Sequence, residues 1–155
     1  MGFATEAEMG GQVNNDEKWN KAAFRVGSND SFDPAEVSGV LGFEPTTSGR
    51  KGEIRGNGRP PRRNSIWSLH SPLASQEPLD KHLEWLLDRL EPKADAIGGI
   101  SQRYEVDFFC GFSSENGQGG CTFDASLLDR LARLKLPLVL DLYPPGPISP
   151  ESDQD

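Results

Sequence analysis

The sequence lacks the features of several large protein classes. No apolar run in its 155 residues exceeds four, whereas a transmembrane helix needs about 20 apolar residues. Two cysteines are too few for a disulfide-rich secreted domain. The first residues carry neither the basic nor the apolar stretch of a signal peptide. These absences predict a soluble, cytoplasmic protein.

Motifs for catalysis and for metal binding are also missing. The spacing around Lys51 is not that of a P-loop, and the Gly-x-Ser-x-Gly elbow of serine hydrolases does not occur. Cysteines at 110 and 121 and histidines at 70 and 82 do not have the spacing of a zinc site. We therefore expect no metal and no cofactor, and we favour a binding protein over an enzyme.

Apolar residues are concentrated in the middle of the chain. Residues 22–143 hold 32 of the 35 Leu, Ile, Val and Phe residues, enough for the core of one domain. Residues 1–21 show no apolar period and are predicted to be a disordered leader, with Trp19 as its only anchor. Residues 144–155 are rich in proline and acidic, which predicts an extended tail.

The first predicted helix covers residues 34–41. Asp33 is a favourable N-cap residue, Pro34 fits the first helical position, and Gly42 is a typical stop. The inward-facing residues of this helix are expected to be Val37, Val40 and Leu41.

Two further leucine-rich segments predict helices. One begins near Pro78, is interrupted at Pro92, and ends at residues 98–99, which are both glycine. The other follows the cap residue Asp124 and ends before Pro137. Its inward-facing residues are expected to be Leu127, Leu128, Leu131 and Leu134.

Alternating and β-rich segments predict the strands. The expected ranges are 22–27, 51–55, 65–69, 103–112, 121–123 and 138–143. Residues 103–112 alternate between apolar and charged side chains, which indicates one core face and one solvated face. The element order β-α-β-β-α-β-β-α-β predicts an α+β fold, a mixed sheet with helices mainly on one face and a ferredoxin-like centre.

Charge is unevenly distributed along the chain. The formal net charge is −8, yet residues 50–63 carry +5 and the remainder therefore −13. Such an acidic excess disfavours binding to duplex nucleic acid and suits a cationic partner protein.

The basic segment 45–63 is a candidate anion site. Its hydroxyl groups, glycines and cations are typical of turns that hold a phosphate or a carboxylate. The candidate ligands are Thr46, Thr47, Ser48, Arg50, Lys51 and Arg55. The alternative, which we favour, is a surface turn before a charged edge strand that resists aggregation. Residues 59–63 could be an arm for nucleic acid or an acidic partner, but we favour a mobile hairpin tip that its charge keeps soluble. This arm has no interleaved aromatic residue to stack on bases.

A second candidate surface is acidic. Asp80, Glu84 and Asp88 form a carboxylate stripe on the outer face of the second helix, which a cationic partner could contact. Trp67 and His70, at the end of a predicted strand, are added as partner-binding candidates. Ser68 and Ser71 beside His70 are a weak signal for a nucleophile, because no orienting carboxylate is evident.

The cysteines leave two redox states open. Cys110 is expected to point inward from its strand, and Cys121 could face it across a hairpin and form a disulfide under oxidation. In a reducing compartment both would be thiols packed as small apolar residues.

Several segments, taken in order, are similar to one family. They are Phe-x-Val-Gly at 24–27, Asp-Pro-x-x-Val-Ser-x-x-Leu-Gly at 33–42, Glu-Pro-Thr-Thr with Arg-Lys-Gly at 44–52, Ile-Trp-Ser-Leu at 66–69, Leu-x-x-His-Leu at 79–83, and the leucine-rich segment 128–143. Together they resemble an uncharacterised bacterial family, domain of unknown function 4279, over residues 22–143. The resemblance implies a single soluble bacterial domain and supplies no catalytic residue.

Two functions follow from these patterns. The first is a non-catalytic protein-interaction domain with an acidic surface, similar to an immunity protein that neutralises a toxin. The alternative is an anion- or nucleotide-binding domain that uses the basic segment, with or without turnover.

Overall fold

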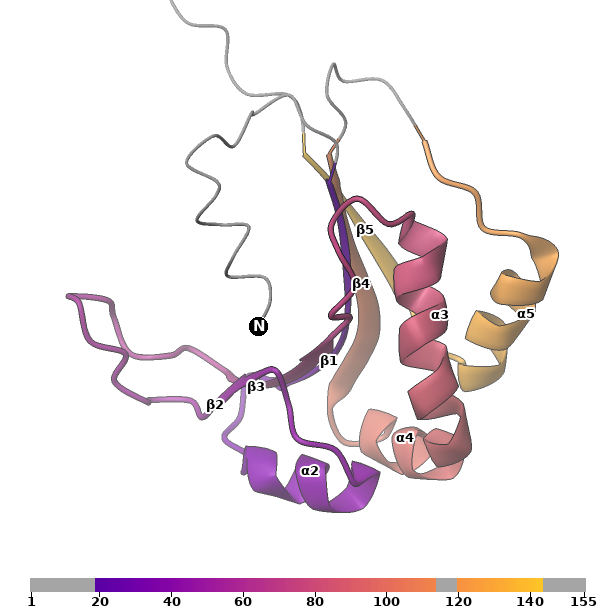
Figure 1. Cartoon of the computed structure of the whole chain (residues 1–155). Helices are drawn as coiled ribbons and strands as arrows, with labels where there is room; N and C mark the ends of the chain where they lie inside the picture. Colours follow the sequence, from indigo (N-terminus) through magenta and orange to yellow (C-terminus); the bar gives the residue numbers. More distant parts are fainter. Residues whose placement is uncertain (1–18, 114–119, 144–155) are drawn as a thin grey trace, which may run out of the picture.

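The structure is a computed structural model that describes residues 19–113 and 120–143. It contains one five-stranded mixed sheet with helices packed on one of its faces (Figure 1). The predicted α+β class is therefore confirmed. The predicted tail at 144–155 and residues 1–18 of the predicted leader lie outside the described residues.

The sheet is built around its first strand. The strands are β1 (Trp19–Ser28), β2 (Thr47–Gly49), β3 (Ser65–His70), β4 (Glu105–Ser113) and β5 (Leu138–Tyr143). Their order across the sheet is β2-β3-β1-β4-β5. All neighbours are antiparallel except β4 and β5, which are parallel.

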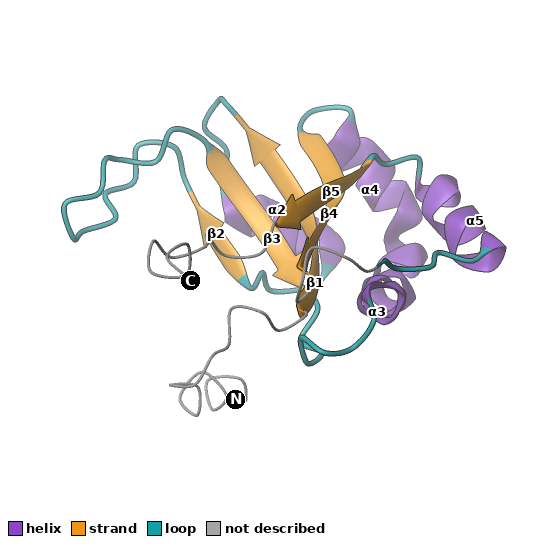
Figure 2. Ribbon diagram, turned by 90° about the horizontal axis from the view of Figure 1, so that it is seen from above, coloured by secondary structure: helices purple, strands orange, loops and turns teal. Residues whose placement is uncertain are grey.

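All helices lie on the same side of this sheet (Figures 1 and 2). They are α2 (Pro34–Leu41), α3 (Leu79–Leu90), the short 3-10 helix η2 (Glu91–Lys93), α4 (Ala94–Ser101) and α5 (Ala125–Leu134). Within residues 19–113 and 120–143, no helix is long and apolar enough to cross a membrane.

The predicted helix boundaries are largely confirmed. The Asp33 carboxylate accepts a hydrogen bond from the Ala35 N–H at 3.0 Å, and Gly42 ends α2 with a φ of 80°. The Asp124 carboxylate accepts from the Leu127 N–H at 2.8 Å and so caps α5. Pro92 interrupts the second helix, as expected from its missing N–H, and separates α3 from α4.

The core lies between the sheet and the helices. Phe24 on β1 has no exposed surface, and its ring contacts Trp67 of β3 and Phe108 of β4 at centroid distances of 6.1 and 5.8 Å. The Trp67 indole N–H donates to the Ser38 hydroxyl at 2.9 Å, which satisfies its polar group. The leucine stripe of α3 packs against this aromatic cluster.

Two predicted strands are wrong. Residues 51–55 leave the sheet because a turn after β2, in which the Glu53 N–H donates to the Arg50 carbonyl, directs the chain outward. Residues 121–123 form a loop. No hairpin partner can pair with β4 there, because β1 and β5 already occupy both of its edges.

Smaller errors concern side-chain orientation and ends. The two glycines at 98–99 do not end the helix, which continues to Ser101 without a positive φ at either glycine. Leu128 on α5 and Val40 on α2 are predicted to face inward, but they are 48% and 46% exposed. Each helix buries the neighbouring side instead. β1 begins at Trp19, so residues 19–21 belong to the sheet rather than to a leader.

The two cysteines differ in burial and therefore in their expected reactivity. Cys110 is buried on β4 and Cys121 is exposed in the loop before α5. Burial raises the pKa of the Cys110 thiol to about 12. Because the thiolate is the reactive form, we expect a thiol reagent to modify Cys121 alone in the native protein and Cys110 only after denaturation. Mass spectrometry of labelled Cys121→Ser measures this. Rapid native labelling of that variant would contradict the assigned face of β4.

Arg130 on α5 forms ion pairs with the end of α3 and with η2. Its guanidinium donates to Glu91 at 2.7 and 3.0 Å and to Asp88 at 2.8 Å, and the Glu91 pKa is lowered chiefly by this hydrogen bonding. A lowered carboxyl pKa stabilises the fold above its ordinary value of 4.5 and less so as the pH falls through the folded-state pKa.

We expect Arg130→Met to lower the free energy of unfolding by about 1 kcal/mol at neutral pH. The difference from wild type should shrink as the pH falls through the lowered pKa of Glu91. Urea unfolding at pH 7 and at several pH values well below 4.5 measures this. Arg133→Met is the control, because Arg133 pairs only with Asp129 of its own helix among the described residues. A pH-independent difference would assign Arg130 a packing role.

Candidate functional site

In the described part of the chain, no helix covers the second face of the sheet (Figure 2). Residues that alternate with the core positions point to this open face. Its centre carries the small residues Ala23 on β1 and Ser68 on β3, while Gly111 on β4 lies under the side chains of Lys21 and Trp19. Longer side chains surround them, so the open face is hollowed.

Two adjoining pockets form one groove on the open face. The first, of about 290 Å³, lies between Asn64, Glu105 and the Arg25–Asp107 pair. The second, of about 250 Å³, extends from Arg25 toward Lys21 and His70. Both pockets are lined by Arg25 and Ile66. We call this surface the open-face groove.

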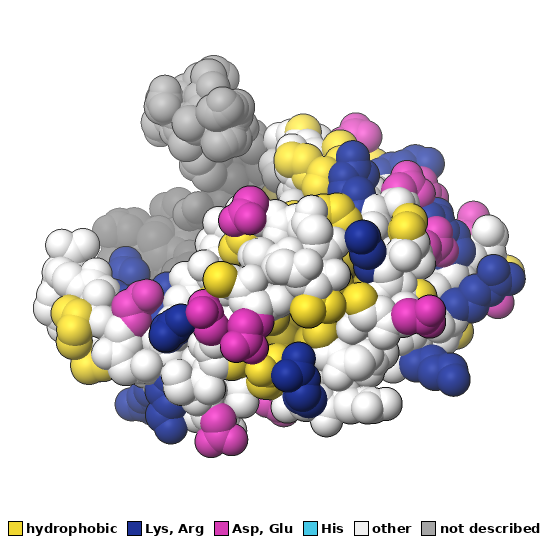
Figure 3. Space-filling model, turned by 90° about the horizontal axis from the view of Figure 1, so that it is seen from below, with side chains coloured by type: hydrophobic (Ala, Val, Ile, Leu, Met, Phe, Trp, Pro, Cys, Tyr) yellow, Lys and Arg dark blue, Asp and Glu magenta, His cyan; other side chains and the backbone are white. Residues whose placement is uncertain are grey.

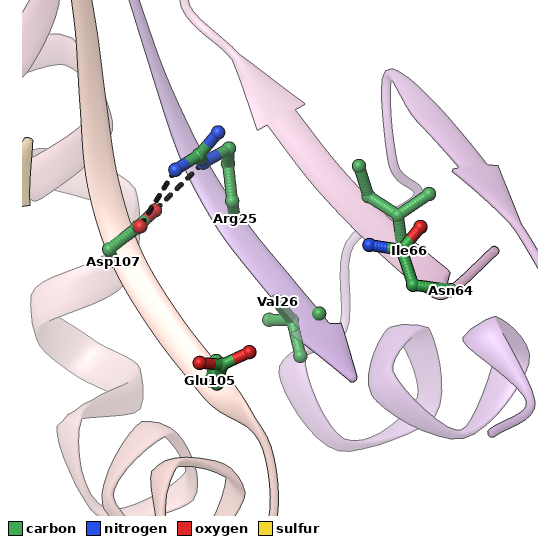
Figure 4. Close-up of a pocket in the computed structure, with 7 residues that line it drawn as sticks. Arg25, Val26, Asn64, Ile66, Glu105 and Asp107 are labelled. Carbon is green, nitrogen blue, oxygen red and sulfur yellow. Dashed lines mark hydrogen bonds and ion pairs between the residues drawn. The ribbon is translucent and has the colours of Figure 1, made fainter. Parts of the chain in front are cut away.

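A bidentate ion pair forms the middle of the open-face groove (Figure 4). Arg25 and Asp107 are directly opposed on β1 and β4, and both guanidinium–carboxylate distances are 2.8 Å. The Arg25 carbon Cζ also lies 4.2 Å from the centroid of the Phe109 ring. The hydrogen bond to Asp107 raises the Arg25 pKa, so this cation is fixed and largely neutralised by its partner.

The other end of the open-face groove is polar and cationic. Lys21 is exposed there, and its Nζ lies 5.3 Å from the centroid of the Trp19 ring. Partial burial of the His70 imidazole, together with the charge of Lys21, lowers the His70 pKa. His70 is therefore mainly neutral at pH 7, where it can both donate and accept a hydrogen bond.

The predicted anion ligands do not converge on one point. Thr47 lines the groove, whereas the Thr46 hydroxyl accepts from the His70 N–H at 2.9 Å. Arg50 is paired with Asp33 at 2.7 Å. The Arg55 guanidinium donates to the Pro60 carbonyl at 3.0 Å. The remaining two candidates are exposed, Ser48 on β2 and Lys51 in the segment that follows it.

The predicted partner-binding residues are also dispersed. Trp67 is completely buried in the core, because its position on β3 faces the helices, and His70 is on the opposite, open face. On α3, Asp88 pairs with Arg130 at 2.8 Å and Glu84 with Lys81 at 3.4 Å, while Asp80 is half-buried. The outer surface of α3 is thus a mixed-charge helix face rather than a continuous acidic site.

The acidic excess of the sequence belongs mainly to residues outside the described ranges. The described residues contain 16 acidic and 15 basic side chains, a formal charge of −1. On the underside of the molecule, near α2 and α4, acidic and basic groups are interspersed around a narrow hydrophobic band (Figure 3). Local pairing therefore describes these surfaces better than net charge does.

His82 makes a Ser–His contact with Ser71. The Ser71 hydroxyl lies 2.9 Å from His82 Nδ1 and accepts a hydrogen bond from the Leu73 N–H at 3.2 Å. Among the described residues, Nε2 has no hydrogen-bond partner, so the orienting carboxylate of a catalytic triad is missing. The contact fixes the loop after β3.

The sequence did not identify Arg25, Asp107 and Ile66 as site residues. Alternation along β1 and β4 places the first two on the solvated face, which was the available signal. Their contact depends on the register between strands 82 positions apart, and no local pattern specifies that register.

The chain belongs to the family described as domain of unknown function DUF4279, whose model matches residues 17–145. No curated protein and no solved structure matches the chain. The family match covers every described element and both pockets.

Burial of His82 predicts a pH dependence of stability. His82 is 1% exposed, and desolvation lowers its pKa below the usual 6.5. A lowered histidine pKa favours the neutral, folded form above 6.5, and its contribution is lost as the pH falls through the folded-state pKa. The free energy of unfolding should therefore decrease below pH 6.5, before the carboxyl groups titrate.

His82→Gln should flatten this slope, measured by urea unfolding at several pH values. His70→Gln serves as the comparison, because His70 is less buried than His82 and its removal should flatten the slope less. Equal slopes in wild type and His82→Gln would contradict the buried, neutral state of this ring.

Proposed function

We propose that this protein is a non-catalytic protein-interaction domain that binds its partner on the open-face groove. The observation that carries the proposal is the one-sided layering, which leaves a hollowed sheet face with an apolar floor at Ile66 and Phe109. A sheet face of this kind gains free energy when a partner removes its apolar surface from water.

The chemistry of the groove favours binding over turnover. Its strongest cation, Arg25, is held by Asp107, and the Ser71–His82 pair lacks an orienting carboxylate among the described residues. Side chains of both signs at the rim provide orientation through charge complementarity. Such a surface is typical of recognition.

The partner that we propose is a protein with basic side chains, as for an immunity protein and its toxin. Glu105 lines one end of the groove, beside Asp107, and is exposed. A basic side chain placed there would find a carboxylate without displacing Arg25.

We also interpret β1 to β4 with their helices as a ferredoxin-like unit to which α5 and β5 are added. The order β2-β3-β1-β4, with antiparallel neighbours throughout, supports this interpretation, as does the β-α-β-β-α-β succession of these elements. The added β5 widens the open face by one strand.

The test uses a substitution on the groove floor and a matched one elsewhere. The full chain captures proteins from an extract of the source organism, and each captured protein is purified and titrated by calorimetry. Ile66→Lys should weaken its binding at least tenfold, about 1.4 kcal/mol, because it places a charge on the apolar floor. Leu128→Lys, an exposed site on α5, should leave the affinity unchanged.

Two results would contradict the proposal. Equal affinities of wild type and Ile66→Lys would place the interface elsewhere. Saturable thermal stabilisation by a nucleotide or phosphorylated metabolite, lost in Lys21→Ala, would instead support the anion-binding alternative, because Lys21 is the exposed cation of the groove.

A further inference from the structure

The segment between β2 and β3, residues 50–64, is not explained by the open-face groove. We call it the basic arm. Antiparallel neighbouring strands need a connection of only about 2–5 residues, whereas the basic arm has 15. It projects from the sheet on the side opposite α3 and α5 (Figure 1). All its residues are exposed except the half-buried Arg62, so the core does not require it.

Internal contacts hold the basic arm in a defined shape. The Gly52 N–H donates to the Arg62 carbonyl at 2.8 Å, and the Arg62 N–H donates to the Glu53 carbonyl at 3.0 Å. The Arg62 guanidinium then pairs with the Glu53 carboxylate at 2.9 Å and lies across Gly49, where a Cβ would collide with it. Positive φ values at 56–58 close the tip. A preorganised arm loses little entropy on binding.

Most cations of the basic arm are available for a partner. Arg50 is neutralised by Asp33 and Arg62 by Glu53. The other four cations of the arm have no carboxylate partner among the described residues: Lys51, Arg55, Arg59 and Arg63. The described residues outside the arm carry 15 acidic and 9 basic side chains. The arm is therefore a local positive region on an otherwise acidic domain.

Ile54 distinguishes between the possible anionic partners. It is 74% exposed and lies between Glu53 and the cation Arg55. The phosphate groups of a nucleic acid offer no apolar contact to such a side chain, whereas a protein surface does. Residues 50–64 contain no aromatic side chain that could stack on a base. These features favour an acidic polypeptide over a nucleic acid.

We propose that the basic arm binds an acidic segment of a partner protein, with Ile54 in an apolar contact and the four cations facing carboxylates. This inference concerns a second surface and does not depend on the open-face groove. Charge complementarity accelerates such an encounter, and the apolar contact slows dissociation.

The first measurement is fluorescence anisotropy at low salt with the full chain. The probes are a labelled Asp/Glu-rich peptide with interspersed leucines, the same peptide with serine for leucine, and an oligothymidylate of equal charge. We expect the leucine peptide to bind roughly tenfold more tightly than the serine peptide and more tightly than the oligothymidylate. Ile54→Ser should remove the preference for leucine.

The second measurement compares two charge reversals of equal size. Lys51→Glu/Arg59→Glu/Arg63→Glu should abolish peptide binding. Lys81→Glu/Arg103→Glu/Lys135→Glu, at exposed sites elsewhere, should reduce it only slightly. Ile66→Lys should leave it unchanged, so failure here can be distinguished from failure of the proposed function.

Three results would overturn the inference. The first is oligothymidylate binding as tightly as the leucine peptide, with no effect of Ile54→Ser, which would assign the arm to phosphate groups. The second is an equal loss of peptide affinity in the two triple variants, which would show that binding depends on net charge alone. The third is the absence of binding to either peptide.

Discussion

The antiparallel alignment of β1 with β3 on one side and β4 on the other determines both faces of this molecule. It places Phe24 opposite Leu69 and Phe108, and so assembles the core. Because successive side chains point to opposite faces, the next residue, Arg25, must lie on the open face. The same register sets it against Asp107. A slip of one residue would bury Arg25 and expose Phe24.

Local chemistry in the sequence accounts for the helices and for part of the sheet. Asp33, Gly42 and Asp124 specify helix ends through their own hydrogen bonds and φ values, so their roles can be predicted from a few neighbouring residues. The alternation in β4 likewise identifies its core face. Residues 121–123 also have strand character, yet β4 has no edge left for them. Which segments pair with β4 depends on residues far away in the sequence, and local patterns carry no information about them.

The same distinction explains the site predictions. Trp67 is predicted at a partner surface because it lies near a strand end. Its place in the alternation of side chains along β3, however, directs it into the core. The acidic stripe of α3 was derived from helical spacing alone, and Arg130, which neutralises Asp88 and Glu91, comes from a helix 42 positions away. Net charge was a poor guide for a related reason: the described domain is nearly neutral, and its charges act as local pairs.

The two proposed surfaces share a structural origin at Ser65. This residue is completely buried, and its hydroxyl accepts hydrogen bonds from the Phe32 N–H at 3.1 Å and the Lys51 N–H at 3.0 Å. It thereby joins the start of β3, the entry to α2 and the base of the basic arm. The next residue is Ile66, on the floor of the open-face groove.

The base of the arm is therefore held beside the groove floor by a buried polar contact rather than by the arm's exposed charges, which limits the spacing between the two surfaces. A partner that uses both surfaces must present its acidic segment and its groove-filling segment at that spacing. This geometric requirement selects among partners more strictly than charge or apolar area alone, because a partner of the right composition but the wrong spacing can occupy only one surface.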